Sequence, residues 1–332
     1  MVGAGSLGYH HTRLLRDVPG ARLVGFHDAN PERASQVASE LGVPAFASLA
    51  TLLDAVDAVT IVVPTTAHHV VARQAIAAGA HVLIEKPITV TIEEADELLD
   101  LAERAGVLVQ TGHVERFNRA IRAALPFVDA PRFIESNRLA PFNPRGSDVA
   151  VVLDLMIHDI DLVRTLVGGV VSDIAAVGVG VLTPSVDIAN ARLTFASGAV
   201  ANITASRVSR ERTRKIRLFQ QSGYLSLDLA AGNGVFYRLR READLASLAA
   251  GGPVALEAFV EAVPLEAPEG EPLKLELESF VAAIRGEGEV PVTGADGRQA
   301  LAIALQIMAD IERSFPHLSG AMPGMGAPPA HA

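Results

Sequence analysis

The stretch Gly3-Ala4-Gly5-Ser6-Leu7-Gly8, near the start of the chain, decides the fold class. It has the spacing G-x-G-x-x-G, and a helical stretch over residues 10–16 and an apolar strand over residues 23–26 follow it. The strand runs into Asp28, about 20 residues after the last glycine, which is the order of a dinucleotide-binding fold. The first glycine permits a tight turn, the second lets the backbone approach a pyrophosphate, and the third lets the helix pack closely on the sheet. The sequence therefore predicts an α/β protein with a parallel sheet.

Asp28 distinguishes between the dinucleotide cofactors. Its carboxylate can accept a hydrogen bond from a ribose 2′-hydroxyl but would repel a 2′-phosphate, so the sequence favours NAD over NADP. The helix that begins at the loop stabilises the pyrophosphate charge at its N-terminus. The residues that we expect to bind NAD at this end of the chain are Gly3, Gly5, Ser6, Leu7, Gly8 and Asp28.

The strand before the glycine loop is short. A dinucleotide fold needs a strand of about five residues there, in the middle of the sheet. Only Met1 and Val2 precede Gly3 in this sequence. We therefore expect the native polypeptide to start upstream of Met1, and mass spectrometry of the native protein tests this expectation.

Further apolar strands alternate with helices up to about residue 112. The runs over residues 58–63, 81–84 and 107–110 are predominantly apolar without polar alternation, which indicates a parallel sheet covered on both faces. Polar residues stand where each run ends, and the carboxyl ends of parallel strands form one ligand-binding edge. These strand-end residues are Pro64, Thr65, Glu85, Lys86 and His113. A capping box of Thr91 with Glu94 predicts the start of the helix that precedes the last of these strands.

Composition narrows the class of protein. The 332 residues carry 28 Lys+Arg against 38 Asp+Glu, and this net charge of −10 would on average repel nucleic acids and anionic membranes. The chain is 49% hydrophobic and 20% charged, an ordinary globular mixture. It has no cysteine, which excludes disulfides, thiolate metal sites and cysteine nucleophiles. We expect a soluble, cytoplasmic protein with two domains and with no nucleic-acid or membrane partner.

Lys86 is the first candidate for catalysis, because it follows a buried strand at the expected ligand edge. The alternative interpretation is an ordinary surface lysine at the end of a strand. Asp154, His158 and Asp161 are the second group, at i, i+4 and i+7 of a helix expected over residues 149–166, so they share one face. Burying three ionisable groups among apolar residues is costly without a function. A solvated helix face and a metal site are the alternatives, and no further ligand cluster supports a metal.

An acid–base role fits these residues. Oxidation of an alcohol requires a hydride to leave carbon while a proton leaves oxygen, and a neutral histidine is a suitable proton acceptor. A carboxylate one turn away can orient the ring and stabilise the imidazolium.

The second half of the chain changes to period-two alternation, which predicts an antiparallel sheet. The expected strands cover residues 133–138, 174–181, 189–195, 199–206, 215–220 and 224–228. We therefore predict a dinucleotide-binding domain over residues 1–114 and an α+β domain over residues 115–318. Residues 319–332 are rich in Gly, Pro, Ala and Met and are expected to be disordered.

Basic residues crowd the stretch from Arg207 to Arg217, where Glu211 is the acid among them. Forked arginine contacts could bind a diphosphate there, or the stretch could be a solvated edge strand protected by its charge. Arg138 and Arg145 are similar candidates. The histidines at other positions, His11 among them, show no partner pattern, and we assign them no role.

With these residues placed, the chain resembles the Gfo/Idh/MocA family of oxidoreductases from Gly3 to about Phe315. The resemblance rests on the glycine loop, Pro64 with His68, Glu85-Lys86-Pro87, and the pair Asp154 and His158. It implies a catalytic triad of Lys86, Asp154 and His158. It implies cofactor contacts for Pro64, Thr65, His68, Glu85 and Lys86. The family's second domain carries a large, mostly antiparallel open sheet, which implies a homo-oligomer formed through that sheet.

Residues 112–118, 138–142, 154–163 and 187–192 also resemble nucleotide-sugar dehydrogenases of the UDP-N-acetylglucosamine 3-dehydrogenase type, which feed a 3-aminosugar pathway such as that toward lipid A. This resemblance implies NAD-dependent oxidation of a sugar-ring hydroxyl, at C3 of a UDP-amino sugar. The residues expected on the substrate side are His113, Arg116, Asn118, Arg138, Arg145, Asp161 and Arg207. An NAD-retaining glycoside hydrolase that acts by transient oxidation and a non-catalytic NAD-sensing regulator remain as alternatives. The assignment of the base to Lys86 or to His158 also stays open.

Overall fold

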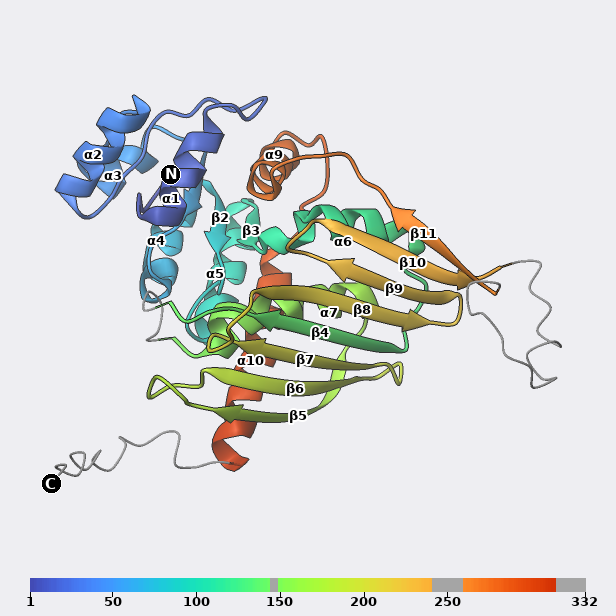
Figure 1. Ribbon diagram of the computed structural model, residues 1–332. Helices are drawn as coiled ribbons and strands as arrows, with labels where there is room; N and C mark the ends of the chain where they lie inside the picture. Colours follow the sequence, from blue (N-terminus) through green and yellow to red (C-terminus); the bar gives the residue numbers. More distant parts are fainter. Residues whose placement is uncertain (144–148, 241–258, 315–332) are drawn as a thin grey trace, which may run out of the picture. The chain divides into compact units, whose positions relative to one another are not determined.

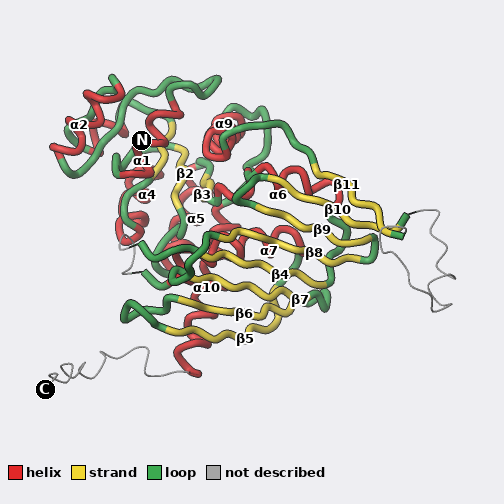
Figure 2. Tube along the Cα trace, viewed as in Figure 1, coloured by secondary structure: helices red, strands yellow, loops and turns green. Residues whose placement is uncertain are grey.

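The computed structural model describes residues 1–143, 149–240 and 259–314. The chain forms two compact units, shown as a ribbon in Figure 1 and by element type in Figure 2. The first unit combines Met1–Val128 with Leu227–Ala302, and the second combines Asp129–Ser226 with the residues from Ile303 onward. The tail over residues 319–332, which the sequence predicts to be disordered, lies outside the described residues.

The first unit is not contiguous in sequence, in contrast to the predicted division at residue 114. Helix α9 (Pro272–Ile284) packs back on α1 (Ser6–Leu15), and the buried side chains of Leu14, Leu277 and Phe280 form one apolar cluster between them. This burial brings a segment from late in the chain to the N-terminal elements, which a reading along the sequence does not detect.

A parallel sheet with the order β1-β2-β3 forms the centre of the first unit. Its strands are β1 (Ala58–Ile61), β2 (His81–Glu85) and β3 (Val109–Gly112). The remaining elements of the N-terminal segment are α2 (Pro31–Leu41), α3 (Leu49–Leu53), α4 (Thr65–Ala77), α5 (Ile92–Ala105), the 3₁₀ turns η1 (Val114–Phe117) and η2 (Leu125–Phe127), and α6 (Arg119–Ala124). The predicted capping box is present at the start of α5, where Thr91 and Glu94 satisfy each other's backbone N–H groups.

Val2 occupies the middle of this parallel arrangement. It forms isolated parallel bridges to His27 on one side and to Ile61 on the other. The amine of Met1 is buried and donates to the carbonyl oxygen of Gly25 at 3.1 Å. The strand expected over residues 23–26 is reduced to isolated bridges at Phe26 and His27, which pair with Ala45 and Val2.

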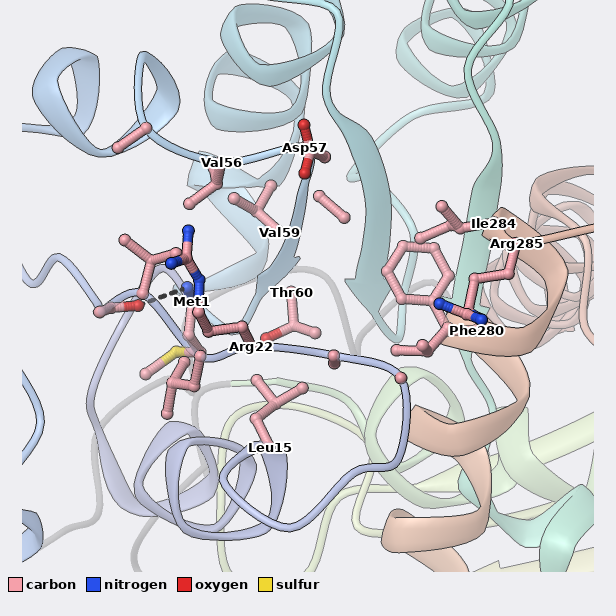
Figure 3. A pocket seen from close by; sticks show the side chains of 18 residues that line it. Met1, Leu15, Arg22, Val56, Asp57, Val59, Thr60, Phe280, Ile284 and Arg285 are labelled. Atoms are coloured by element: carbon pink, nitrogen blue, oxygen red, sulfur yellow. Dashed lines mark hydrogen bonds between the residues drawn. The ribbon is translucent and has the colours of Figure 1, made fainter.

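Met1 lines a cavity of about 420 Å³, shown in Figure 3. Residues 20–25 and 55–60 line it, together with Phe280 and Ile284 from α9 and Arg285 directly after that helix. The hydroxyl of Thr60, at this cavity, is buried and has no hydrogen-bond partner within the described part of the chain. The cavity therefore lies beside the segments that precede His27 and Ile61, the two bridge partners of Val2.

An eight-stranded sheet has the order β11-β10-β9-β8-β4-β7-β6-β5. Its strands are β4 (Phe133–Leu139), β5 (Val171–Val179), β6 (Ile188–Phe195), β7 (Val200–Ser206), β8 (Thr213–Gln220), β9 (Gly223–Asp228), β10 (Asn233–Leu239) and β11 (Val260–Leu265). The pairing of β4 with β7 is parallel, and the pairings of β4 with β8, β5 with β6, β6 with β7 and β10 with β11 are antiparallel.

The predicted α/β class and the large, mostly antiparallel second sheet are confirmed. Two details differ. Strands β10 and β11 were not expected from the sequence. The alternative that the basic stretch near Arg217 is a solvated edge strand is wrong, because β8 lies between β9 and β4.

Helix α7 (Ile157–Val167) packs against β4 and β7 in the second unit. A π-helical turn, η3 (Val152–Met156), leads directly into it. The last described helix is α10 (Gly294–Ser314). Within the described residues, none of the helices combines the length and the apolar character needed to cross a membrane.

Candidate active site

The glycine loop has the geometry that a pyrophosphate requires. Gly3 has φ +90°, and a Cβ there would lie 2.7 Å from the carbonyl oxygen of Val62. A Cβ on Gly8 would collide with the carbonyl oxygen of Gly3, so the helix can approach the turn only without a side chain. A Cβ on Gly5 would meet no atom within 4 Å. The open side at Gly5, at the N-terminus of α1, therefore fits the phosphates of a dinucleotide.

Asp28 lies beside this loop. Its carboxylate accepts from the backbone N–H of Ala4 at 2.5 Å and from that of Asn30 at 2.8 Å. These bonds fix the carboxylate at the end of the strand segment, where the fold places an acceptor for a ribose hydroxyl.

Arg33 is a residue at this loop that the sequence analysis missed. Its Nε donates to the carbonyl oxygen of Ala4 at 2.7 Å, and its guanidinium carbon lies 6.0 Å from the ring centroid of Tyr9. The signal for it was weak, because Arg33 stands in the first turn of α2 with no motif of its own. It adds a cation to the rim of the predicted cofactor site.

His68, predicted to contact the cofactor, lies beneath the strand-end loops. Its Nδ1 is 2.8 Å from the carbonyl oxygen of Pro87, and its Nε2 is 2.9 Å from that of Val63. Burial lowers the pKa of His68, although both carbonyl groups and the charge of Glu85 act in the opposite direction. The ring therefore connects the segment that precedes α4 with the segment that follows Lys86. Pro64 and Thr65 lie at the N-terminus of α4, as expected for residues at the end of a strand.

Lys86 directly follows β2, as the sequence predicts, and its side chain is half-buried. The Lys86–Pro87 peptide bond is cis. The preceding Glu85 is buried, and its Oε2 accepts from the backbone N–H of Lys86 at 3.2 Å. Its Oε1 lies 3.1 Å from Nε2 of His11.

The ionisation of Glu85 follows from these contacts. Burial alone would raise the pKa of Glu85. The hydrogen bond and charge of His11, together with the charge and backbone N–H of Lys86, outweigh burial and lower it. The carboxylate is therefore ionised and accepts from Nε2–H of His11. His11 is a second residue that the sequence analysis missed, because its partner is 74 positions away in the chain.

Three predicted substrate residues follow β3 in the first unit. His113 is buried. Nη1 of Arg116 donates to the carbonyl oxygen of Pro291 at 3.0 Å and lies 3.6 Å from Asp296. The side chain of Asn118 donates to Glu115 and to the carbonyl oxygen of Leu229, and it caps α6. Arg116 and Asn118 thus have structural partners within the unit, and their substrate contacts stay predictions.

The predicted helix of the second unit begins with an irregularity at the candidate residues. Asp154 lies in the π-helical turn η3, and His158 and Asp161 lie in α7. The regular helix expected over residues 149–166 is therefore wrong in its first turns. Asp154 and His158 are half-buried, whereas Asp161 is buried. Single π-helical turns are rare and occur frequently at functional sites.

Two of the predicted substrate arginines belong to buried ion pairs of the second unit. Arg138 is 3% exposed and makes a forked contact with Asp159, at 2.7 and 3.1 Å. Arg207 is 4% exposed, lies 3.6 Å from Asp187 and donates to the carbonyl oxygen of Val149. The predicted role was an open cation for a diphosphate, and the observed geometry is that of a structural pair. Arg145 lies outside the described residues.

The carboxylate of Asp187 has further partners. It accepts from the backbone N–H groups of Val181, Leu182 and Thr183, and these bonds hold its pKa below the usual value although burial acts to raise it. Over the part of the chain that the structure describes, no three His, Asp or Glu side chains gather as a metal ion would require. Lys86 belongs to the first unit and Asp154 and His158 to the second, so their joint action is part of the proposal below.

The loop that leaves space at Gly5, the acid at Asp28 and the lysine at the end of β2 define a class of protein. This class is the NAD-dependent oxidoreductases with a Rossmann sheet.

Comparison with known proteins gives the family. A family model described as "Oxidoreductase family, NAD-binding Rossmann fold" matches residues 1–113, and the GFO/IDH/MocA C-terminal domain matches residues 130–226. The chain belongs to the Gfo/Idh/MocA family of oxidoreductases, and its cofactor is NAD.

Individual relatives cover most of the chain. UDP-N-acetylglucosamine 3-dehydrogenase of Acidithiobacillus ferrooxidans is 40% identical over 313 residues, which are 94% of this chain and 96% of the relative. A solved structure of that enzyme superposes with a TM-score of 0.85 over 94% of this chain and 96% of the other, at 39% identity. The scyllo-inositol 2-dehydrogenase of Bacillus subtilis is 32% identical over 63% of this chain and 67% of its own. A levoglucosan dehydrogenase solved with NADH, at 19% identity and a TM-score of 0.81, covers 94% of this chain and 96% of its own and supports the fold alone.

Proposed function

We propose that this protein oxidises the C3 hydroxyl of UDP-N-acetylglucosamine to a ketone, with NAD as the oxidant. The observation that carries the proposal is the position of Lys86 at the end of β2, in the same unit and at the same strand ends as the glycine loop and Asp28. The relative that is 40% identical over 94% of the chain supports the choice of substrate.

The chemistry divides the hydroxyl group into a hydride and a proton. NAD, when bound, accepts the hydride from C3 of the sugar. The hydroxyl proton passes to His158, which Asp154 orients, while Lys86 donates a hydrogen bond to the oxygen that becomes the carbonyl. The half-buried positions of Lys86, Asp154 and His158 suit groups that must reach a ligand.

Lys86 is the alternative base, and the pH–rate profile separates the two assignments. A histidine base makes kcat/KM fall on the acid side, with a midpoint between about pH 5 and pH 8. The variant His158→Gln then loses this limb, whereas Lys86→Arg keeps it. If the limb persists in His158→Gln, Lys86 is the base.

Substrate recognition is part of the same proposal. His113, Arg116, Asn118 and Asp161 are proposed to lie on the sugar side, and Arg138, Arg145 and Arg207 on the side of the diphosphate. Arg138 and Arg207 would act there through the ion pairs that fix their surroundings, since their guanidinium groups are held by Asp159 and Asp187.

The test is incubation of the purified protein with NAD and UDP-N-acetylglucosamine while NADH absorbance is followed. The proposal expects stoichiometric NADH, which a hydrolase that regenerates its cofactor at each turnover would not release. A signal with free inositols or hexoses but none with the nucleotide sugar would overturn the substrate and leave the family assignment intact.

We also propose that the protein is a cytoplasmic homo-oligomer that serves a 3-aminosugar pathway such as that toward lipid A. Exposed apolar side chains on or near the outer strand β5 support the oligomer, with Val177 42% and Val179 48% exposed. Light scattering of the wild type and of Val179→Lys tests it, and a monomeric wild type would overturn it. Cell fractionation of the producing organism tests the location.

A further inference from the structure

The buried pair of His11 and Glu85 has no part in the reaction as proposed so far. His11 is fully buried in α1, three positions after the last glycine of the loop. Its Nε2 donates to Glu85, and its Nδ1 has no hydrogen-bond partner among the described residues. Burying two polar groups in this way costs free energy, so the arrangement calls for a reason beyond packing.

The other carboxylate oxygen of Glu85 contacts Lys86. Oε2 accepts from the backbone N–H of Lys86, and the carboxylate interacts electrostatically with the lysine charge. The end of β3 leaves space for the same carboxylate, because a Cβ on Gly112 would lie 2.9 Å from it. A single carboxylate therefore meets the helix of the glycine loop, the end of β2 and the end of β3.

We propose that His11 and Glu85 are positioning residues for Lys86: His11 holds the Glu85 carboxylate, and the carboxylate fixes the Lys86 backbone and supplies the negative charge beside its ammonium group. The catalytic role of Lys86 rests on the proposed function, whereas the interaction of the Glu85 carboxylate with Lys86 is independent of it.

The surroundings of Glu85 make its charge effective. The ionisable groups that interact with it are His11 from α1, His68 from α4 and Lys86, which directly follows β2. Glu85 is the anion of this group, so its removal should destabilise the ammonium form of Lys86.

A titration of lysine side chains measures this directly and needs no substrate. The lysines of the chain are Lys86, Lys215 and Lys274, so ¹³C-methylated protein gives few resonances, which Lys→Arg variants assign. We expect Glu85→Gln to lower the titration midpoint of Lys86, because the neighbouring anion is lost. Lys274 should not move in Glu85→Gln. The matched control Glu278→Gln removes the ion-pair partner of Lys274 and should leave the titration midpoint of Lys86 unchanged.

Variants of His11 separate positioning from simple packing. His11→Gln keeps an amide donor for Glu85, whereas His11→Leu fills the space without one. We expect kcat to fall about 10- to 100-fold in Glu85→Gln and His11→Leu, with a much smaller change in the KM for NAD, because a misplaced lysine slows the chemical step. His11→Gln should recover most of the loss.

The outcomes distinguish this inference from the proposed function. A wild type that forms no NADH with the nucleotide sugar defeats the proposed function, and the lysine titration still tests the pair. An active wild type with an unmoved Lys86 midpoint in Glu85→Gln overturns the pair alone. If Glu85→Gln does not fold, equal kcat and equal Lys86 midpoints in His11→Leu and His11→Gln overturn it, and a difference between them upholds it.

Discussion

The predicted site residues at the strand ends of the first unit lie where the sequence places them, whereas those in the α7 region of the second unit do not all do so. In the first unit, Gly5, Asp28 and Lys86 lie at the edge that the order of strands and helices requires. In the second unit, Arg138 and Arg207 are buried against carboxylates rather than open to a ligand. Backbone geometry fixes the first group, whereas tertiary partners decide the second. A motif that works through the backbone therefore transfers from sequence to structure more safely than a count of charges.

The largest expected effect is a loss of kcat on substitution of Lys86, the catalytic candidate of the first unit. Lys86→Ala should lower kcat by about 10²- to 10⁴-fold, because a donor to the reacting oxygen is lost. NAD affinity should fall much less than kcat, since the glycine loop that binds the pyrophosphate is untouched. Steady-state kinetics and NAD titration measure both, with Lys274→Ala, a half-buried lysine in α9, as the control. A Lys86→Ala enzyme with the wild-type kcat would contradict the role.

The next effect tests the second region through its stability. Arg138→Met should destabilise the protein by about 3–5 kcal/mol, because it leaves the Asp159 carboxylate buried and unpaired. The double variant Arg138→Met/Asp159→Leu should recover most of the loss. Urea denaturation of the two variants measures the difference. If Arg138→Met is as stable as the wild type, Arg138 is an open cation and the contrast between the regions fails.

A pH dependence follows from the buried amine of Met1. Burial lowers its pKa from 8.0 to about 5. Between these values the unfolded chain binds a proton that the folded chain does not, so stability should fall by a few kcal/mol as pH drops from about 8 to about 5. Urea midpoints at several pH values measure the slope.

The matched control for that slope adds residues in front of Met1. A short extension in front of Met1 removes the amine from its buried position beside Gly25. We expect it to abolish this part of the pH dependence. An extended variant with the same slope would show that another group is responsible.

The smallest expected effect is on the Kd for NAD, and it tests which glycine of the loop makes room for the cofactor. Gly5→Val should raise the Kd for NAD about tenfold or more, because the side chain occupies the space where the pyrophosphate approaches. The melting temperature should stay near that of the wild type, since a Cβ on Gly5 meets no protein atom within 4 Å. Gly8→Ala should instead disturb folding, because its Cβ collides with Gly3. Equal losses of NAD affinity and stability in both variants would contradict this division.

Much of the first unit could be predicted because its signals are local. The glycine spacing, the apolar strands and the capping box of Thr91 and Glu94 each depend on neighbours within a few residues. The pair of His11 and Glu85 depends on a contact across 74 positions, and that of Arg138 and Asp159 on one across 21. In neither pair do the neighbouring residues in the sequence indicate the distant partner.

The sequence also did not predict the π-helical turn at Asp154 or the strands β10 and β11, for a related reason. The spacing of Asp154, His158 and Asp161 fits a regular helix, and a switch to i→i+5 bonding leaves no mark in apolar periodicity. Strand β10 pairs with β11 across a long intervening segment, so no short turn signals the hairpin.

The central claim is that NAD receives its hydride from C3 of the nucleotide sugar. UDP-N-acetylglucosamine carrying deuterium at C3, incubated with the enzyme and NAD, should yield NADH that contains the deuterium, detected by mass spectrometry of the nicotinamide. The rate should fall with the labelled substrate if hydride transfer limits turnover. Unlabelled NADH, or no NADH from this sugar while another sugar is oxidised, would contradict the account.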